Sequence, residues 1–193
     1  MKVERILPWL GVLALCTAGP AISQEQQKPE GQASSAPAMA APQPGPEHQM
    51  LARDAGVWEA TVESWMEPGK PPAISKGVET NTMLGGMWLL TEFKSEFGGA
   101  PFQGHGVTGF DPIKKKFVGT WVDSMSAGLN LSEGTYDPTT KTLTGYIDGP
   151  GPDGKPARMK QVSEWKDPDT RVFTMYPPGG NAPLMRITYK RQK

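Results

Sequence analysis

Apolar and polar side chains alternate along most of the chain after residue 56. The first such run places Trp58, Ala60 and Val62 on one face, with acidic and hydroxyl side chains between them. A period of two is the side-chain period of a β-strand, so this run predicts a strand. Nine similar runs follow, at residues 74–84, 87–97, 103–110, 116–124, 129–136, 142–148, 158–166, 171–176 and 184–190. We therefore expect ten strands.

One short helix is predicted before the strands. Residues 46–56 begin with Pro46 and Glu47 and end at Gly56. Proline and an acidic residue are favoured in the first turn of a helix, and glycine is favoured just after the last turn. The strands that follow are joined by short segments rich in Gly, Pro, Asp and Asn. Such connections favour antiparallel hairpins and leave no room for crossover helices.

Three of the connections share one pattern. Asp111, Asp137 and Asp167 are each followed by proline, by a basic residue four positions after the Asp, and by a large apolar residue at six. Aspartate at the first turn position accepts backbone hydrogen bonds and proline presets the second position, so each copy should close a hairpin. The hairpins fix which side chains of the returning strands point inward: Phe117, Gly119, Trp121, Leu143, Gly145, Ile147, Phe173 and Met175.

These elements predict an all-β fold. A sheet of eight to ten strands without helices to cover one face must close on itself or fold into a sandwich. We favour closure, which gives an antiparallel up-and-down β-barrel of about ten strands with one short N-terminal helix. Gly119 and Gly145, at interior positions, are expected to leave space beside Trp121 for a small ligand, although glycine also serves bends in barrels.

Composition excludes several classes of function. The chain has 193 residues with 20 Lys and Arg against 20 Asp and Glu, so it lacks the basic excess that nucleic-acid binding needs. One cysteine and two histidines make a zinc site improbable, and we expect no metal and no cofactor. The 23 Gly and 20 Pro residues argue against a helical bundle.

The first 23 residues have the layout of a secretory signal peptide. Lys2 and Arg5 precede an apolar stretch over residues 6–15, and small residues follow as far as Ser23. The apolar stretch is too short to span a bilayer, so we expect cleavage near Ser23, export, and no stable membrane anchor. A lipidated Cys16 is the alternative. The sequence does not distinguish the periplasm from the extracellular medium.

The next 23 residues are predicted to be a disordered linker. Residues 24–46 consist mainly of Gln, Ala, Pro, Ser and Gly, with no apolar periodicity. The folded unit is then a single domain over residues 47–193. Its length is sufficient to bury about two thirds of the surface that the unfolded chain exposes.

A glycine-rich string at residues 104–109 matches the dinucleotide-binding pattern G-x-G-x-x-G. That motif requires a helix directly after it, so that the helix N-terminus meets the pyrophosphate. Here the string leads into the turn at Asp111 and Pro112 instead. We therefore interpret it as part of a strand and predict no nucleotide site.

The candidate ligand-binding side chains are taken from the predicted barrel interior and its mouth. Aromatic side chains would form an apolar wall, His105 would be a polar ligand or a base, and Asp123 would line the mouth or cap the following loop. Glu92 is expected to be solvated. No motif of nucleophilic, metal or phosphate chemistry occurs, so no catalytic residue is predicted. The six candidates are Trp88, His105, Phe117, Trp121, Asp123 and Phe173.

Several blocks of the sequence resemble a bacterial family known as domain of unknown function 1579. The blocks are residues 104–111 with 116–124, the segment 85–89, and the Gly56 to Trp58 step after the helix. The resemblance implies a calycin-like, lipocalin-related barrel that is often exported and whose role is unassigned. It carries no catalytic residues to this chain. The related nitrobindin-type haem proteins use a histidine on a strand near the chain end, and residues 184–190 contain none, so haem is not expected.

Three functions remain open at the level of sequence. The leading hypothesis is an exported module that binds a small hydrophobic or amphipathic molecule inside the barrel. The second is an enzyme with His105 as general base at the barrel mouth, oriented by Asp123 or Glu92. The third is a structural or interaction protein with a packed core. The sequence does not set the oligomeric state.

Overall fold

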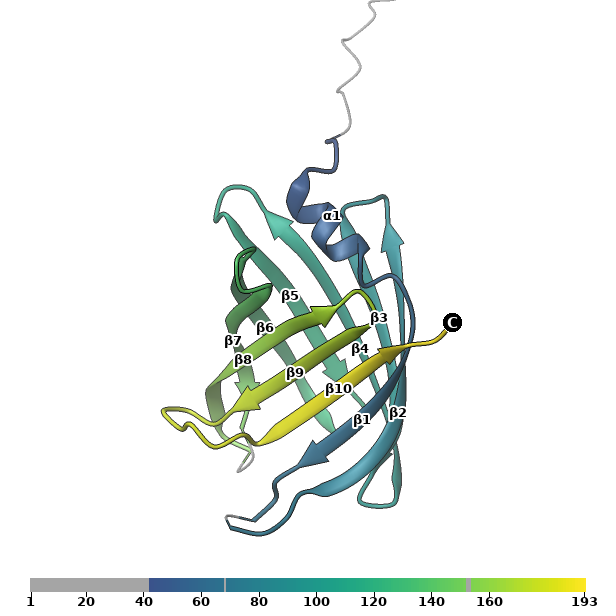
Figure 1. Cartoon of the computed structure of the whole chain (residues 1–193). Helices are drawn as coiled ribbons and strands as arrows, with labels where there is room; N and C mark the ends of the chain where they lie inside the picture. The colour runs from purple at the N-terminus through teal and green to yellow at the C-terminus, as the bar shows by residue number, and fades with distance from the viewer. Residues whose placement is uncertain (1–41, 68, 152–153) are drawn as a thin grey trace, which may run out of the picture. The chain divides into compact units, whose positions relative to one another are not determined.

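A computed structural model describes residues 42–67, 69–151 and 154–193 (Figure 1). The predicted signal peptide, Cys16 and most of the predicted linker lie outside these residues. Residues 41–193 form one compact unit. No helix among the described residues has the length and apolar character needed to cross a bilayer.

Ten antiparallel strands close into a barrel, as the alternation predicts, and each strand pairs with its neighbours in the chain while β1 pairs with β10. One helix, α1, precedes them and lies across one end of the barrel (Figure 1). The elements are α1 (Pro46–Ala52), β1 (Gly56–Ser64), β2 (Ala73–Leu84), β3 (Trp88–Phe97), β4 (Ala100–Asp111), β5 (Lys116–Asp123), β6 (Ser126–Asp137), β7 (Thr142–Pro150), β8 (Pro156–Asp167), β9 (Thr170–Tyr176) and β10 (Met185–Arg191).

The helix is shorter than its sequence signals predict. It ends at Ala52, and Gly56 does not follow its last turn but starts β1 with a φ of 122°. The backbone of Asp54 and Ala55 donates to carbonyls of Leu51 and Ala52, which prolongs the turn without continuing the helix. The chain then enters the barrel wall directly.

The three Asp-Pro turns form as predicted. The Asp111 carboxylate accepts hydrogen bonds from the backbone N–H groups of Ile113 and Lys114 at 2.8 and 3.0 Å. Asp137 and Asp167 each accept one from the residue two positions on, at 2.8 Å. Hydrogen bonds to the charged form lower the pKa of both Asp137 and Asp167.

The third turn differs from the other two in length. Asp111 pairs with Lys116 and Asp137 with Thr142, whereas Asp167 pairs with Thr170 after an irregularity in the register. The basic residue of the first two repeats therefore stays in the turn, with positive φ at Lys115 and Lys141. In the third repeat the corresponding residue, Arg171, already belongs to a strand.

The predicted inward phase is confirmed by the strand register. Phe117 lies across from Gly134, Ile147 from Met159, and Phe173 from Ile187, so that these positions share the inner face. One apolar cluster includes Met50 and Leu51 of α1 together with Leu89 and Phe117. A second surrounds Trp58, which is fully buried, and is contacted by the half-buried Trp121 and Phe173.

The glycines beside Trp121 are not those that the sequence indicated. A Cβ atom on Gly104 would lie 2.2 Å from the indole of Trp121, and one on Gly106 would lie 3.1 Å from it. Gly119 and Gly145 instead lie against backbone oxygens of the neighbouring strands, at 2.9 and 2.2 Å from such an added atom. The glycine-rich string is thus a β-strand, and two of its glycines seat an aromatic ring.

Candidate functional site

A buried ion cluster crosses the inside of the barrel below α1. The guanidinium of Arg171 on β9 donates to Asp54, which follows α1, and to Glu79 on β2, both at 2.5 Å. Burial opposes the charge on Arg171, but the carboxylates of Glu79 and Asp54 outweigh that cost and raise its pKa further. The side chain is therefore a permanent cation with two anionic partners.

Further side chains complete this cluster. Asp54 also accepts a hydrogen bond from the indole of Trp165 at 2.6 Å, and Glu79 accepts one from Asn81 at 2.6 Å. The guanidinium carbon lies 4.1 Å from the ring centre of Tyr189. The Nε atom of Arg171 is buried and has no hydrogen-bond partner in the described part of the chain. The cluster thus links the segment after α1 to β2, β8, β9 and β10.

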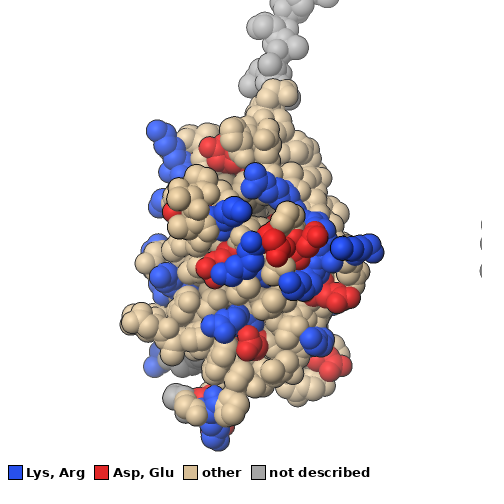
Figure 2. Space-filling model, viewed as in Figure 1, with Lys and Arg blue, Asp and Glu red and all other residues tan. Residues whose placement is uncertain are grey.

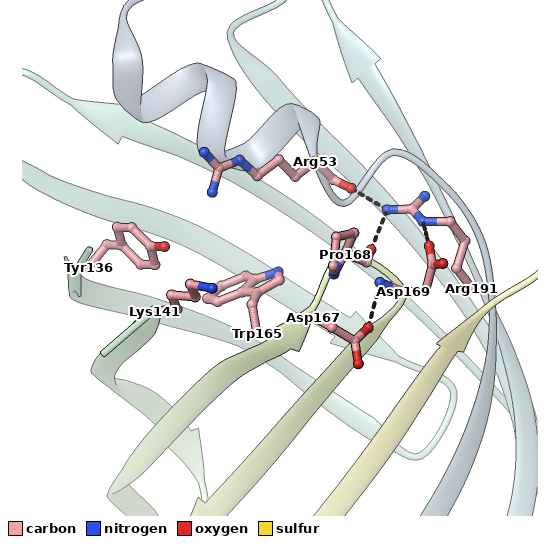
Figure 3. Close-up of a pocket in the computed structure, with 8 residues that line it drawn as sticks. All are labelled: Arg53, Tyr136, Lys141, Trp165, Asp167, Pro168, Asp169 and Arg191. Atoms are coloured by element: carbon pink, nitrogen blue, oxygen red, sulfur yellow. Dashed lines mark hydrogen bonds and ion pairs between the residues drawn. The ribbon is translucent and has the colours of Figure 1, made fainter. Parts of the chain in front are cut away.

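Concave surface is found at the α1 end. A groove of about 400 Å³ is lined by Arg53 directly after α1, by residues at the β6–β7 and β8–β9 turns, and by Arg191 of β10 (Figure 3). A second groove, of about 860 Å³, runs between α1, the β4–β5 turn and the β6–β7 turn. Arg53, Tyr136 and Lys141 line both, so the grooves adjoin one another around the helix.

Arg191 fixes one wall of the smaller groove. Its guanidinium donates to the carbonyl of Arg53 and pairs with Asp169 at 3.3 Å (Figure 3). It also donates to the carbonyl of Ala55 at 2.7 Å. The same group lies 4.1 Å from the ring centre of Trp58. The segment after α1 is thereby held to the last strand, and the helix keeps a fixed position over the barrel end.

The apolar part of the larger groove is aromatic. Phe110 and Phe117 meet edge to face with ring centres 5.3 Å apart, beside Met50 of α1. Tyr136 continues this surface and meets Trp165 edge to face at 5.7 Å. Aromatic edges and a methionine offer a ligand an apolar surface that adapts to its shape.

The polar rim carries an excess of positive charge. Arg53, Lys115 and Lys141 line the larger groove with a single carboxylate, Glu47. No ion pair found among the described residues involves any of the three cations. In the smaller groove Asp167 is engaged by its own turn and Asp169 by Arg191. The grooves thus favour an anionic group.

Of the six candidate residues, Phe117 lines a groove and three others face the barrel interior away from α1. Trp121 and Phe173 pack on the apolar cluster that surrounds Trp58. Asp123 accepts a hydrogen bond from the Trp121 indole at 3.1 Å and one from the backbone of Met125 at 2.9 Å. It therefore caps the β5–β6 turn and orients the indole.

The two remaining candidates, Trp88 and His105, lie on the outer wall of the barrel. Trp88 lies on the outer wall, 40% exposed, with its ring against Gly109 of the next strand. His105 is exposed and pairs across the strands with Glu92, and the Nε2 of Gln103 lies 3.2 Å from both side chains. Glu92 is solvated, as predicted.

This placement also excludes a base at the barrel mouth formed by His105 and Asp123. The register pairs His105 with Val122, so Asp123 points to the opposite face of the sheet. The described residues hold no group of three or more His, Cys, Asp and Glu side chains arranged for a metal ion.

The residues that build the site were not identified from the sequence. Asp54, Glu79 and Arg171 come from three distant segments. Arg53 had no signal beyond its charge, and Lys141 had only its position in the second Asp-Pro repeat. The only available sign for Arg171 was its position in the third Asp-Pro repeat. That repeat has the same spacing as the other two, so the shorter turn could not be inferred.

Comparison with known proteins identifies a family and a similar fold. The family described as "Protein of unknown function (DUF1579)" matches residues 43–191. The barrel is similar to the crystal structure of Rv2717c from M. tuberculosis, with a TM-score of 0.57 and 15% identity over 78% of this chain and 100% of that chain. A redesigned β-barrel aligns with a TM-score of 0.40 and 13% identity, over 76% of this chain and 96% of that one. None of the curated proteins matches this sequence.

Proposed function

Because this chain belongs to the DUF1579 family, whose function is unknown, we propose a function from its geometry: it binds a small amphipathic molecule with an anionic head group. The site is the pair of grooves at the α1 end of the barrel. The observation that carries this proposal is the combination of an aromatic floor with a cationic rim in the same grooves.

The apolar part of the ligand would lie along Met50, Phe110 and Phe117. These side chains are buried or half-buried and still line the larger groove. Its volume of about 860 Å³ falls within the range of about 300–1,000 Å³ typical of small-molecule sites. Burial of an apolar chain there contributes roughly 25 cal/mol for each Å² removed from water.

The head group would lie near Arg53 and Lys141, where the two grooves meet. Both side chains are exposed, so their attraction for an anion is screened by solvent and salt. Such rim charges orient an anionic ligand and disfavour a cationic one more than they increase affinity. We therefore expect the rim charges to select an anionic ligand, and the apolar chain of the ligand to supply most of the affinity.

Isothermal titration calorimetry of the full chain with dodecanoate tests this function. We expect saturable binding of one molecule, and about tenfold weaker binding for Arg53→Glu/Lys141→Glu. Lys160→Glu, on the outer face of β8, is the matched control and should bind as the wild type does. Absence of binding, or equal binding of the cation dodecyltrimethylammonium, would contradict the proposal.

We also propose that the protein acts after export. Lys2, Arg5 and the apolar residues 6–15 support a signal peptide. Fractionation of the producing cells and N-terminal sequencing of the mature protein test this point. The expected mature N-terminus is Gln24, and a protein that retains residues 1–23 in the cytoplasm would exclude export.

A further inference from the structure

Charged and apolar side chains are distributed unevenly over the outer wall of the barrel. Lys and Arg mixed with Asp and Glu cover the face formed by β8, β9, β10 and β1 (Figure 2). On β2 to β6 the outward positions include a group of exposed apolar side chains, which lies beside Glu92, His105 and Thr120. Six of these side chains are between 36% and 58% exposed, and together they define the outer apolar face: Leu84, Trp88, Val107, Val122, Leu129 and Leu131.

The strand register makes this face continuous. Leu90 on β3 pairs with Val107 on β4, which pairs with Thr120 on β5, which pairs with Leu131 on β6. In the adjoining row, Trp88 pairs with Gly109 and Gly109 with Val118. Directly paired positions on one face of a sheet lie about 5 Å apart, so these positions are neighbours across four strands, with Thr120 as the polar member of the row.

Gly109 makes the face flat. A Cβ atom at this position would lie 2.3 Å from the Trp88 ring, so only glycine lets the indole lie down on the wall. An indole held in this way is already ordered and loses little side-chain freedom when another surface covers it.

We propose that the outer apolar face is the interface of a homodimer, in which it packs on the same face of a second copy of this chain. The ten described strands form a closed barrel with no free edge strand to pair, so a second copy would contact the face of the sheet. A two-fold axis through the face matches each patch with an identical one, as in most homodimers.

The charges at the rim of the face do not repel a second copy. On one side Glu133 pairs with Lys114 at 2.5 Å and with Lys116 at 3.2 Å. On the other side Glu92 pairs with Lys94 at 2.7 Å. Because these rim charges are already paired, they offer no attraction to a strongly charged partner. They are compatible with the same apolar face of a second copy.

The size of the face is that of an interface core. Side chains of these types and exposures present on the order of 500 Å² of apolar surface, which is at the upper end for a patch on a monomer. A stable dimer buries about 800 Å² on each partner, of which the polar rim can supply the remainder.

Sedimentation equilibrium of the full chain, without ligand, tests the dimer. We expect a mass of two chains at about 200 µM, and at least tenfold weaker association for Val107→Lys/Leu131→Lys. Thr144→Lys, at an exposed outward position of β7, is the matched control and should associate as the wild type does. Circular dichroism verifies that each variant folds. If the double variant does not fold, the association of Leu131→Ser is measured in its place.

A wild-type chain that remains monomeric at this concentration would overturn the proposal, as would a dimer that both Leu131 variants leave unchanged. A monomer that instead cosediments with phosphatidylcholine vesicles would assign the face to lipid. The proposed ligand site lies at the α1 end, so failure of the dimer and failure of ligand binding are separate outcomes.

Discussion

The guanidinium of Arg171 lies 2.5 Å from the carboxylate of Asp54, although the two residues are 117 positions apart in the chain. Asp54 follows α1, and Arg171 also holds Glu79 on β2. Since β1 and β10 close the barrel and lie between β2 and β9, the cluster spans the closure from inside. It thereby joins the segment after α1 to both sides of the closure and, through the Trp165 indole, to the smaller groove.

Arg171→Met should destabilise the fold strongly. Removal of the cation leaves Asp54 and Glu79 buried without their partner, which costs about 3–5 kcal/mol in the free energy of unfolding. Equilibrium unfolding in urea measures the loss. Arg186→Met is the control, because Arg186 and Glu63 form a half-exposed pair at 3.9 Å whose removal should cost less than about 1 kcal/mol. Equal losses in the two variants would contradict the structural role of the cluster.

Gly104→Ala should cost more stability than Gly106→Ala. The new methyl group would lie 2.2 Å from the Trp121 ring at residue 104 but 3.1 Å from it at residue 106. Displacement of a packed ring costs about 1–3 kcal/mol, and the second variant needs only a small adjustment. Urea unfolding followed by tryptophan fluorescence compares them. The reverse order would show that Trp121 does not lie against Gly104.

Stability should decline in alkali because of Tyr189. Burial and the nearby carboxylate of Glu79 raise the pKa of its phenol well above the usual value near 10. The neutral form is thus favoured in the folded state, and its contribution is complete below about pH 10. It is lost as the pH rises towards the folded-state value, because the unfolded chain ionises first.

Thermal unfolding between pH 8 and pH 12 measures this effect. Tyr189→Phe removes the titrating group and should flatten the decline above about pH 10. Tyr146→Phe, with an exposed ring on the outer wall, is the matched control and should leave the profile unchanged. An undiminished decline in Tyr189→Phe would show that other groups cause it.

The sequence predicted the architecture because its signals are local. The alternation of β1 and the three Asp-Pro turns depend on neighbouring residues, and the structure confirms them. Local signals did not decide which way Trp88 and His105 point. Residues 87–90 are all apolar, so their pattern does not show which side chains point inward. His105 lies between two glycines, and because glycine has no side chain, its neighbours do not show which face of the strand is buried.

The candidate site was less predictable because it depends on distant contacts. Asp54, Glu79 and Arg171 have no shared motif, and only closure of the barrel brings them together. The cationic rim depends on how α1 is placed over the turns. That placement results from contacts of Arg191 with Arg53 and Ala55, which sequence spacing does not reveal.

The most direct test of the ligand site is amide chemical-shift mapping of the isotopically labelled full chain during titration with dodecanoate. We predict shifts centred on α1, on the turn between Asp111 and Lys116, and on the turn between Asp137 and Thr142, which together surround the two grooves. Shifts centred instead on Trp121 and Asp123 at the opposite end, or no shifts at saturating dodecanoate, would contradict the proposed site.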